Sequence, residues 1–574
     1  MIDLQGNPYY LDQDQCQWVN DRRKKMSLEE KLGQLFFVIG LEKDPQKLYE
    51  LYQKIPFGGI MYRPDYAASI KERNEYLQEH VDIPLLVAAN LEAGGIGIAV
   101  DGTSFASQME VAATGDKENA YLLGKVSAAE GKSVGVNLAF APVCDIDRNW
   151  RNPITNTRTY GSDPQVVLQM AGEYMRGCRE ENVAVSLKHF PGDGCDERDQ
   201  HLVTTVNDLS CEEWDSTYGH IYQELIQQGA QTVMVGHIMQ PAYSRRIRPE
   251  IRDEEIMPGS CSEEVVNGLL REKLGFNGVV LTDAANMLGY CGAMSRREQI
   301  PATINAGCDM ILFGKNLEED YSYLKAAVLN GVVSMERIDQ SVTRILALKA
   351  SLHLHDKKAG NWCREEDSVR EDLKEESGKI VGCEKFRKLA ARCADQAITL
   401  VKDTQHLLPV TPDTHRRVWL HIAGDQPGFA GGAKCKDWVL NALTEAGFEV
   451  DYYDHEQARI EDTMIAMEEI RQKYDVIMYF SNVINASYQT VARINWHGMV
   501  AEDGPYYVKE VPTLFVSFGN PYGYVDVPMI RTMINAYHAS ETTVQAVVQK
   551  ITGKNPFRGI SPVDPFCGMF GAKL

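Results

Sequence analysis

The sequence lacks the features that mark secreted or membrane proteins. Its start has no basic segment followed by an apolar one, so we expect no signal peptide. No stretch is apolar over the length that a bilayer requires. The 13 cysteines are scattered without a Cys-x-x-Cys pair, which predicts neither a zinc site nor a small disulfide framework. Together these absences favour a cytoplasmic protein.

Positive charge is also scarce. The chain has 59 Lys and Arg against 80 Asp and Glu, a formal net charge of -21. Such an excess of negative charge argues against nucleic acid or an anionic membrane surface as a partner. At 574 residues the chain is longer than one hydrophobic core usually serves, so we expect at least two domains.

What the sequence does contain is a series of short apolar runs that alternate with helical stretches. Continuous apolar runs are typical of parallel strands buried on both faces. The runs are 34–39, 58–62, 85–89, 136–141, 183–187, 232–235, 278–281 and 310–313. This alternation predicts an N-terminal (β/α)8 TIM-like barrel over residues 1–356. A polar segment, 357–384, reads as a linker, and strand and helix patterns resume in a second domain over 385–574.

One stretch concentrates the chemistry. The run 183–187 ends in Lys188-His189-Phe190-Pro191-Gly192, and the loop beyond it crowds Asp196, Asp199 and His201 into a few residues. Barrel enzymes carry their catalytic groups where strands end and polar loops begin. A metal site built from Cys195, Asp196, Asp199 and His201 is an alternative, but such tight loop spacing implies no ligand geometry.

The run from Lys188 to Gly192, followed by Asp199-Gln200-His201, resembles the signature of family 3 glycoside hydrolases, in the β-N-acetylglucosaminidase branch. The segments 407–410 and 517–522 resemble motifs of the second domain of that family. The resemblance implies an α/β fold in which a C-terminal three-layer α/β sandwich follows the barrel. It implies no metal and no organic cofactor.

Asp283 is the candidate nucleophile. It ends the run 278–282 and precedes a helix-like segment, so spacing alone also fits an aspartate that caps a helix. The segment 274–284 is similar to the nucleophile strand of the family, and the resemblance places Asp283 on the catalytic aspartate. Retaining glycosidases need such a carboxylate near the anomeric carbon and an acid beside the departing oxygen.

His201 is the candidate general acid/base, with Asp199 as its partner. An imidazole titrates near neutral pH, and a carboxylate beside it fixes its tautomer. A solvated loop pair is the plain alternative. In the resembled branch this Asp-x-His dyad replaces the usual carboxylic acid, and Gln200 stands where a serine is common.

Further residues are expected to contact the sugar. Lys188 and His189 would donate to its hydroxyls, although His189 alone also fits a core histidine. Arg158 resembles the substrate arginine of the family, with a surface arginine as the alternative. The remaining expected contacts are Asn90, Glu92 and Asp145. Asp147 is expected beside Asp145 at the floor of the pocket, and His237 is expected behind the residues that contact the sugar.

The sequence also departs from the family pattern around Asn90 and at Asp193. Asn90 replaces an aspartate in an Asp-x-Glu-Gly-Gly turn, and the arginine that often follows is missing, with Ile96 and Gly97 there. Because an amide accepts no charge-assisted hydrogen bond, the contact to the sugar should be weaker. Asp193 replaces the His or Tyr expected after Phe-Pro-Gly. These changes put the sugar specificity in question.

The prediction is a retaining exo-acting β-N-acetylhexosaminidase. By resemblance it would remove terminal β-linked N-acetylglucosamine from muropeptides or chitin fragments through a covalent glycosyl-enzyme intermediate. One alternative is a phosphorylase, because a neutral histidine would not repel an anionic acceptor. The other is a non-catalytic sugar-binding protein on the same scaffold. The sequence predicts no oligomeric state.

Overall fold

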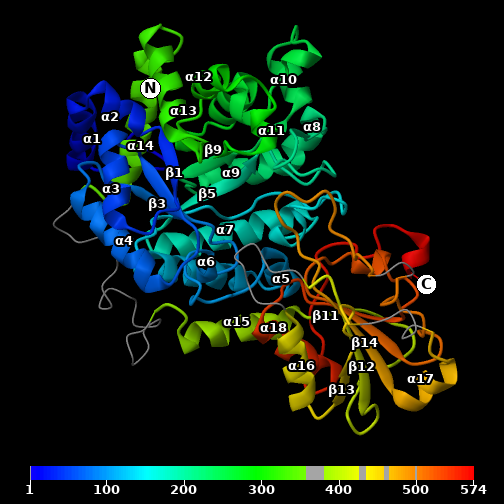
Figure 1. The fold of residues 1–574 in the computed structure, drawn as a ribbon. Helices are drawn as coiled ribbons and strands as arrows, with labels where there is room; N and C mark the ends of the chain where they lie inside the picture. Colours follow the sequence, from blue (N-terminus) through cyan, green and yellow to red (C-terminus); the bar gives the residue numbers. More distant parts are fainter. Residues whose placement is uncertain (1, 357–379, 426–434, 458–463, 498–500, 574) are drawn as a thin grey trace. The chain divides into compact units, whose positions relative to one another are not determined.

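The computed structural model describes residues 2–356, 380–425, 435–457, 464–497 and 501–573. They form two compact units, which Figure 1 colours by sequence. The first comprises 1–104, 120–149 and 164–387, and the second comprises 105–119, 150–163 and 388–574. Most of the predicted linker, 357–384, lies outside the described residues, so the predicted domain boundaries stay a prediction.

The first unit contains the predicted eight-stranded parallel barrel, which is closed in the order β1-β10-β9-β7-β5-β4-β3-β2. Every neighbouring pair is parallel. The strands are β1 (Phe36–Gly40), β2 (Gly59–Tyr62), β3 (Leu86–Ala89), β4 (Leu138–Ala139), β5 (Ala184–Phe190), β7 (Thr232–Val235), β9 (Val279–Ala284) and β10 (Met310–Leu312). All eight apolar runs of the sequence contribute a strand, which confirms the predicted fold class.

Helices alternate with these strands. They are α1 (Gln13–Lys25), α2 (Leu28–Gly33), α3 (Pro45–Lys54), α4 (Ala67–His80), α6 (Lys117–Ser133), α7 (Pro164–Glu180), α8 (Cys211–Trp214), α9 (His220–Gln227), α10 (Pro241–Ile247), the π-helix η6 (Glu264–Lys273), α11 (Leu288–Cys291), α12 (Arg296–Ala306), α13 (Leu317–Leu329) and α14 (Met335–Ser351). A capping box begins α2, with reciprocal hydrogen bonds between Ser27 and Glu30. No helix in the described ranges combines the length and apolar character that crossing a bilayer requires.

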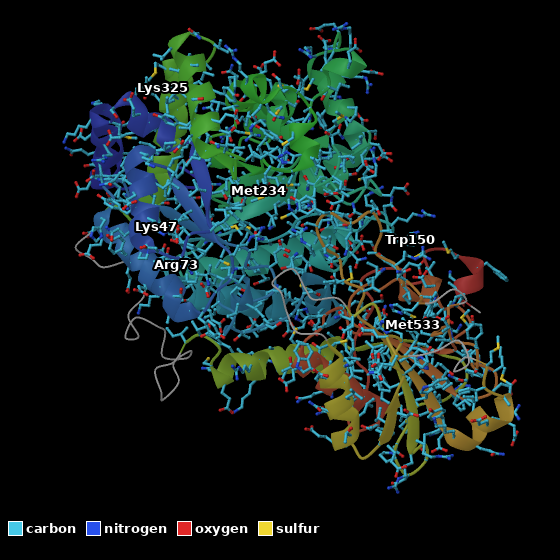
Figure 2. All side chains as sticks on the ribbon, in the orientation of Figure 1. Lys47, Arg73, Trp150, Met234, Lys325 and Met533 are labelled. Atoms are coloured by element: carbon cyan, nitrogen blue, oxygen red, sulfur yellow. The ribbon has the colours of Figure 1, made fainter. Side chains whose placement is uncertain are left out.

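The barrel interior is a packed core. Met234 on β7 is 3% exposed and lies among densely packed side chains in Figure 2. All seven residues of β5 are buried, including the polar pair Lys188 and His189 at its end. Apolar residues dominate the strand centres, and the charged groups lie at the strand ends, where a site can form.

The second unit is built on a six-stranded sheet of order β11-β16-β15-β14-β12-β13. Its strands are β11 (Thr399–Asp403), β12 (Arg417–Ala423), β13 (Glu449–Tyr452), β14 (Val476–Ser481), β15 (Thr513–Ser517) and β16 (Thr532–Asn535). Only β11 pairs antiparallel. Its helices include α5 (Gln108–Ala113), α15 (Glu384–Ala397), α16 (Cys435–Glu445), α17 (Met467–Lys473) and α18 (Glu541–Ile551).

Both faces of this sheet are covered, as the three-layer prediction requires. Met478 of β14 packs in one cluster with Leu443 of α16 and residues of α18. The next residue, Ile477, packs on the opposite face with Ile470 of α17. Figure 1 shows α16 and α18 on one side of the strands and α17 on the other. Alternate residues of one strand therefore serve two separate apolar layers.

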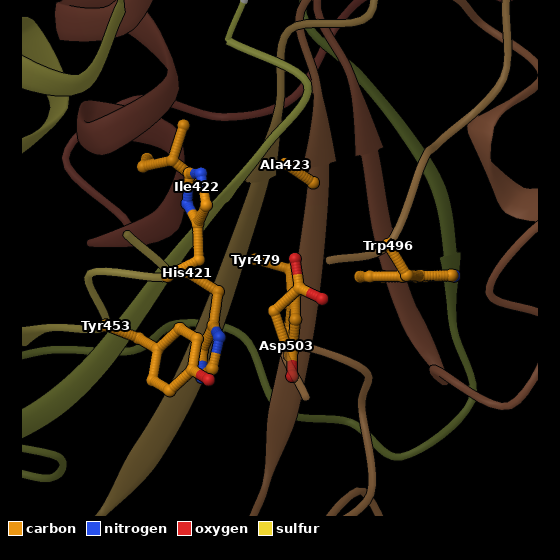
Figure 3. A pocket seen from close by; sticks show the side chains of 8 residues that line it. His421, Ile422, Ala423, Tyr453, Tyr479, Trp496 and Asp503 are labelled. Atoms are coloured by element: carbon orange, nitrogen blue, oxygen red, sulfur yellow. The ribbon is translucent and has the colours of Figure 1, made fainter. Parts of the chain in front are cut away.

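A small pocket lies at the carboxyl ends of β12 and β14 (Figure 3). His421 is stacked between Tyr453 and Tyr479, with ring centroids 4.9 and 4.5 Å away. Within the described part of the chain, both ring nitrogens of His421 are buried without a hydrogen-bond partner. Burial lowers the pKa of His421 to about 3, so the ring is neutral. None of the residues predicted from the sequence as catalytic lines this pocket.

Candidate active site

Lys188 and His189 project from the carboxyl end of β5, and the peptide bond between them is cis. Lys188 Nζ lies 2.6 Å from Glu92 Oε1, and the lysine side chain is only 3% exposed. Glu92 follows β3, so this ion pair connects two strand ends. Because a buried lysine needs a partner to stay charged, Glu92 favours the ammonium form. Both residues were predicted sugar contacts, and the structure brings them together.

His189 is held by Asp145, which lies in the segment after β4. Its Nδ1 is 2.7 Å from Asp145 Oδ2, and its backbone N–H donates to Asp145 Oδ1 at 3.0 Å. Asp145 is fully buried, so it lies behind His189 and fixes the ring. The other ring nitrogen, Nε2, is 3.8 Å from Asp283 Oδ2. The predicted role of Asp145 as a direct sugar contact stays a prediction.

Asp283 lies within β9, and the next helix, α11, begins only at Leu288. The alternative that Asp283 caps a helix is therefore wrong. Its carboxylate is 13% exposed and accepts a hydrogen bond from the N–H of Ala284 at 2.7 Å.

Charge favours the ionised form of this carboxyl. Burial alone would raise the pKa of Asp283. The nearby imidazoles of His189, His237 and His201 outweigh burial and, with a backbone N–H, lower the pKa to about 2. The carboxylate is therefore charged at neutral pH, as a nucleophile must be.

His201 and Asp199 form the predicted dyad. His201 Nδ1 is 2.7 Å from Asp199 Oδ1, and the same oxygen accepts the backbone N–H of His201 at 2.9 Å. The Asp199 side chain is fully buried, whereas the His201 ring is 18% exposed. This arrangement presents an oriented imidazole at the surface of the site and places the orienting carboxylate beneath it.

The loop that carries the dyad is docked on neighbouring elements. The carbonyl of His201 accepts the N–H of Leu288 at 2.9 Å, and Thr204 Oγ1 donates to the carbonyl of Gly289 at 2.7 Å. Beyond them, strand β6 (Thr205–Val206) pairs in parallel with β8 (Ile238–Met239). The segment from His201 to Val206 is therefore held against neighbouring elements by hydrogen bonds.

His237, at the carboxyl end of β7, lies behind Asp283. Its Nδ1 is 2.9 Å from Ser260 Oγ, and its Nε2 is 3.1 Å from the carbonyl of Ala284. Burial lowers the pKa of His237 to about 4, so the neutral ring donates to the carbonyl and accepts from the hydroxyl. Ser260 was not singled out in the sequence, because nothing local distinguishes it from other serines.

Asn90 directly follows β3 and is half-buried. A Cβ at Gly97 would lie 1.9 Å from the carbonyl oxygen of Asn90, so only glycine fits at that position. Asp147 is 3% exposed. Arg158 ends the 3-10 segment η2 (Asn156–Arg158) in the second unit and donates from Nη1 to the carbonyl of Ile154 at 3.3 Å. Its role as the substrate arginine stays a prediction.

Of the four residues of the metal alternative, Asp199 and His201 pair with each other, and the other two contact other groups. Asp196 binds Arg198 at 2.9 and 2.6 Å and accepts the N–H of Val206. Cys195 Sγ lies 3.6 Å from the hydroxyl of Tyr218. Within the described ranges, no three His, Cys, Asp or Glu side chains are arranged to hold a metal ion.

Comparisons with known proteins place the chain among glycosidases of one family. Residues 27–348 match the family model of the glycosyl hydrolase family 3 N-terminal domain. The chain is 42% identical, over the full length of both chains, to a protein of Cellulomonas fimi named β-N-acetylglucosaminidase/β-glucosidase. It is also similar to the solved structure of the β-glucoside phosphorylase BglX, with 42% identity, a TM-score of 0.91 and 99% of each chain covered.

A more distant solved structure supports the fold alone. It is a family 3 β-N-acetylglucosaminidase from Paenibacillus sp. str. FPU-7, 24% identical with a TM-score of 0.78. The alignment covers 95% of this chain and all of that one.

Proposed function

Because the chain belongs to glycosyl hydrolase family 3, we propose that it cleaves terminal β-glycosidic bonds with retention of configuration. The observation that carries this proposal is the pairing of an ionised Asp283 with the Asp199–His201 dyad, which is electrostatically coupled to it. These supply the two groups that a retaining double displacement needs.

In the proposed mechanism Asp283 attacks the anomeric carbon while His201 protonates the departing oxygen. The covalent glycosyl-enzyme then reacts with an acceptor that His201 deprotonates. Asp199 holds the imidazole in one tautomer and stabilises its protonated form. Lys188, oriented by Glu92, and His189, oriented by Asp145, would donate to sugar hydroxyls.

The proposed substrate carries a terminal β-linked N-acetylglucosamine, from muropeptide or chitin fragments. The name of the Cellulomonas fimi relative joins N-acetylglucosaminidase and glucosidase activities, so glucosides belong among the test substrates. The amide at Asn90 fits a less selective sugar contact than a carboxylate would give. A panel of aryl glycosides that differ only at C2 and C4 would define the preference.

A second candidate function is phosphorolysis, which would release a sugar 1-phosphate. The similar structure named a β-glucoside phosphorylase favours it, because the likeness spans 99% of both chains. Once His201 has given up its proton it carries no charge, so it would not repel a phosphate acceptor as a carboxylate would. Turnover in phosphate, compared with a zwitterionic buffer, with the sugar 1-phosphate measured, separates the two acceptors.

The catalytic assignment is tested with two variants and two leaving groups. Asp283→Asn should abolish turnover of all substrates, since an amide cannot form the covalent intermediate. His201→Ala should slow natural disaccharides far more than dinitrophenyl glycosides, because dinitrophenolate departs without a proton. Azide should then accelerate the variant and yield a β-glycosyl azide.

Residual activity of Asp283→Asn within about tenfold of wild type would refute the nucleophile assignment. Equal losses across leaving groups in His201→Ala would move the acid/base role to another residue. A wild-type protein that binds sugars but turns over none of these glycosides would instead support the non-catalytic alternative.

A further inference from the structure

Gln200 stands between the two members of the catalytic dyad, yet its side chain faces away from solvent and is 1% exposed. Its amide nitrogen Nε2 donates to Asp193 Oδ2 at 3.1 Å. Its amide oxygen Oε1 accepts the backbone N–H of His237 at 2.8 Å. One side chain therefore connects the start of the loop that carries the dyad (residues 193–203, the dyad loop) with the end of β7.

The two unusual residues of this loop are thus partners of each other. Asp193 and Gln200 are the positions where the loop departs from the family pattern, and they meet through a charge-assisted hydrogen bond. Asp193 is 3% exposed, and its Oδ1 accepts the N–H of Gly194 at 2.7 Å. Its own N–H donates to Asp145 Oδ1 at 2.8 Å. Because Asp145 also holds His189, a continuous set of hydrogen bonds connects the sugar-binding histidine with the dyad loop.

The surroundings leave room for Gln200 and for little else. A Cβ at Gly236 would lie 2.9 Å from Gln200 Oε1. A Cβ at Gly289 would lie 2.4 Å from the carbonyl oxygen of Gln200 and 2.6 Å from that of Val203. The two neighbouring elements therefore have glycines where the loop packs against them. The loop can approach them closely, so its position on the barrel is defined by packing.

The chemistry of the bridge requires an amide. The side chain must donate to a carboxylate and accept from an N–H at the same time, which a glutamine does in one orientation. An ionised glutamate could accept but not donate, and it would face Asp193 with like charge. An alanine would leave the buried Asp193 oxygen and the N–H of His237 without these partners, which is costly.

We propose that Gln200 is a positioning residue for the general acid/base. Its amide holds the dyad loop against the end of β7, so that His201 has its catalytic position before substrate binds. This inference rests on the proposed function, because it assigns His201 the proton transfer. Gln200 itself touches no substrate in this scheme. Its loss should therefore affect the step that needs a positioned proton donor more than the binding of the sugar.

The test compares Gln200→Ala and Gln200→Glu with matched variants of Gln240. Gln240 is also fully buried and also uses both ends of its amide, donating to Leu209 and accepting from the N–H of Tyr243. It lies at the start of α10 and contacts no member of the dyad loop between Asp193 and Val203 through these bonds. Variants at Gln240 therefore control for the loss of a buried amide.

We expect Gln200→Ala to lower kcat for a disaccharide by about tenfold or more relative to a dinitrophenyl glycoside, the scale of one charge-assisted hydrogen bond. KM should change little. Gln200→Glu should depend on pH in a way that wild type does not. When the introduced carboxyl and Asp193 share a proton, the donor returns, so the activity ratio of variant to wild type should rise as the pH is lowered.

Equal losses on both substrates in the Gln200 and Gln240 variants, or a Gln200→Glu ratio independent of pH, would overturn the inference. The glutamate variant decides the matter even where the alanine variant fails to fold. If His201→Ala shows the leaving-group effect and Gln200→Ala does not, only the positioning role fails. If His201→Ala shows none, the acid/base assignment fails first and the positioning role with it.

Discussion

Replacing His189 by glutamine should move the acidic limb of the pH–rate profile upward. Among the imidazoles that keep the Asp283 carboxyl ionised, His189 has the largest effect. Its Nε2 is 3.8 Å from Asp283 Oδ2. With an effective dielectric constant of about 20, unit charges at this distance attract by about 4 kcal/mol, or roughly 3 pKa units. The other two imidazoles are present in both proteins, so loss of this attraction should raise the pKa of Asp283, now about 2, by up to roughly 3 units.

The assay is kcat/KM against pH with a dinitrophenyl glycoside, whose departure needs no proton, so the acidic limb reports the nucleophile. The sign follows from the pKa. A higher pKa leaves less carboxylate in acid, so kcat/KM of the variant should begin to fall at a higher pH than kcat/KM of wild type. Near neutral pH the shape of the profile should not change. Lost sugar contacts lower the whole curve without moving the limb. His80→Gln, at an exposed histidine of α4, is the matched control. A limb that stays where wild type has it would refute the electrostatic role of His189.

Three further predictions concern specificity and stability. Asn90→Asp should sharpen discrimination between C4 epimers by about 1 kcal/mol, measured as the ratio of kcat/KM values; an unchanged ratio removes Asn90 from the sugar site. Asp309, fully buried against Arg271 and Arg337 with its pKa lowered to about 2, should lose its contribution to the free energy of unfolding as the pH falls from about 4 to 2. Asp309→Asn should cost about 3 kcal/mol or more at neutral pH, because it leaves buried guanidinium groups without their carboxylate, and a loss below about 1 kcal/mol would contradict this. His421→Phe should raise stability, since two unpartnered ring nitrogens disappear. The gain in stability should grow as the pH falls below about 6.5, because the unfolded chain then binds a proton at His421 that the folded chain does not. Calorimetry of both proteins across pH measures this gain, and a difference in stability that does not change with pH would contradict the prediction.

The sequence was sufficient for the barrel because its strands are buried on both faces and read as continuous apolar runs. Asp283, Asp199 and His201 could be recognised because their motifs are local. The contacts between strand ends could not be predicted in the same way. The ion pair of Lys188 with Glu92 joins the end of β5 to the loop after β3, and no periodicity in the sequence relates the two residues.

Side-chain partners within the dyad loop were equally hidden. Asp193 and Gln200 could be seen only as two separate departures, because nothing in a loop sequence says which polar groups meet. The sequence also did not indicate that segments 105–119 and 150–163 belong to the second unit. Their local pattern carries no information about which core their apolar residues join.

These two segments have a consequence for synthesis of the chain. Met109 and Ala113 pack in one buried cluster with Tyr522, Tyr537 and Val563, and Ser107 Oγ donates to the carbonyl of Tyr537. Domains that are contiguous in sequence can fold one after the other as they leave the ribosome. Here the first pieces of the second unit emerge hundreds of residues before their partners. The second unit cannot fold completely until the C-terminal residues have been made. For most of the synthesis, these apolar segments therefore lack the residues against which they pack in the folded protein.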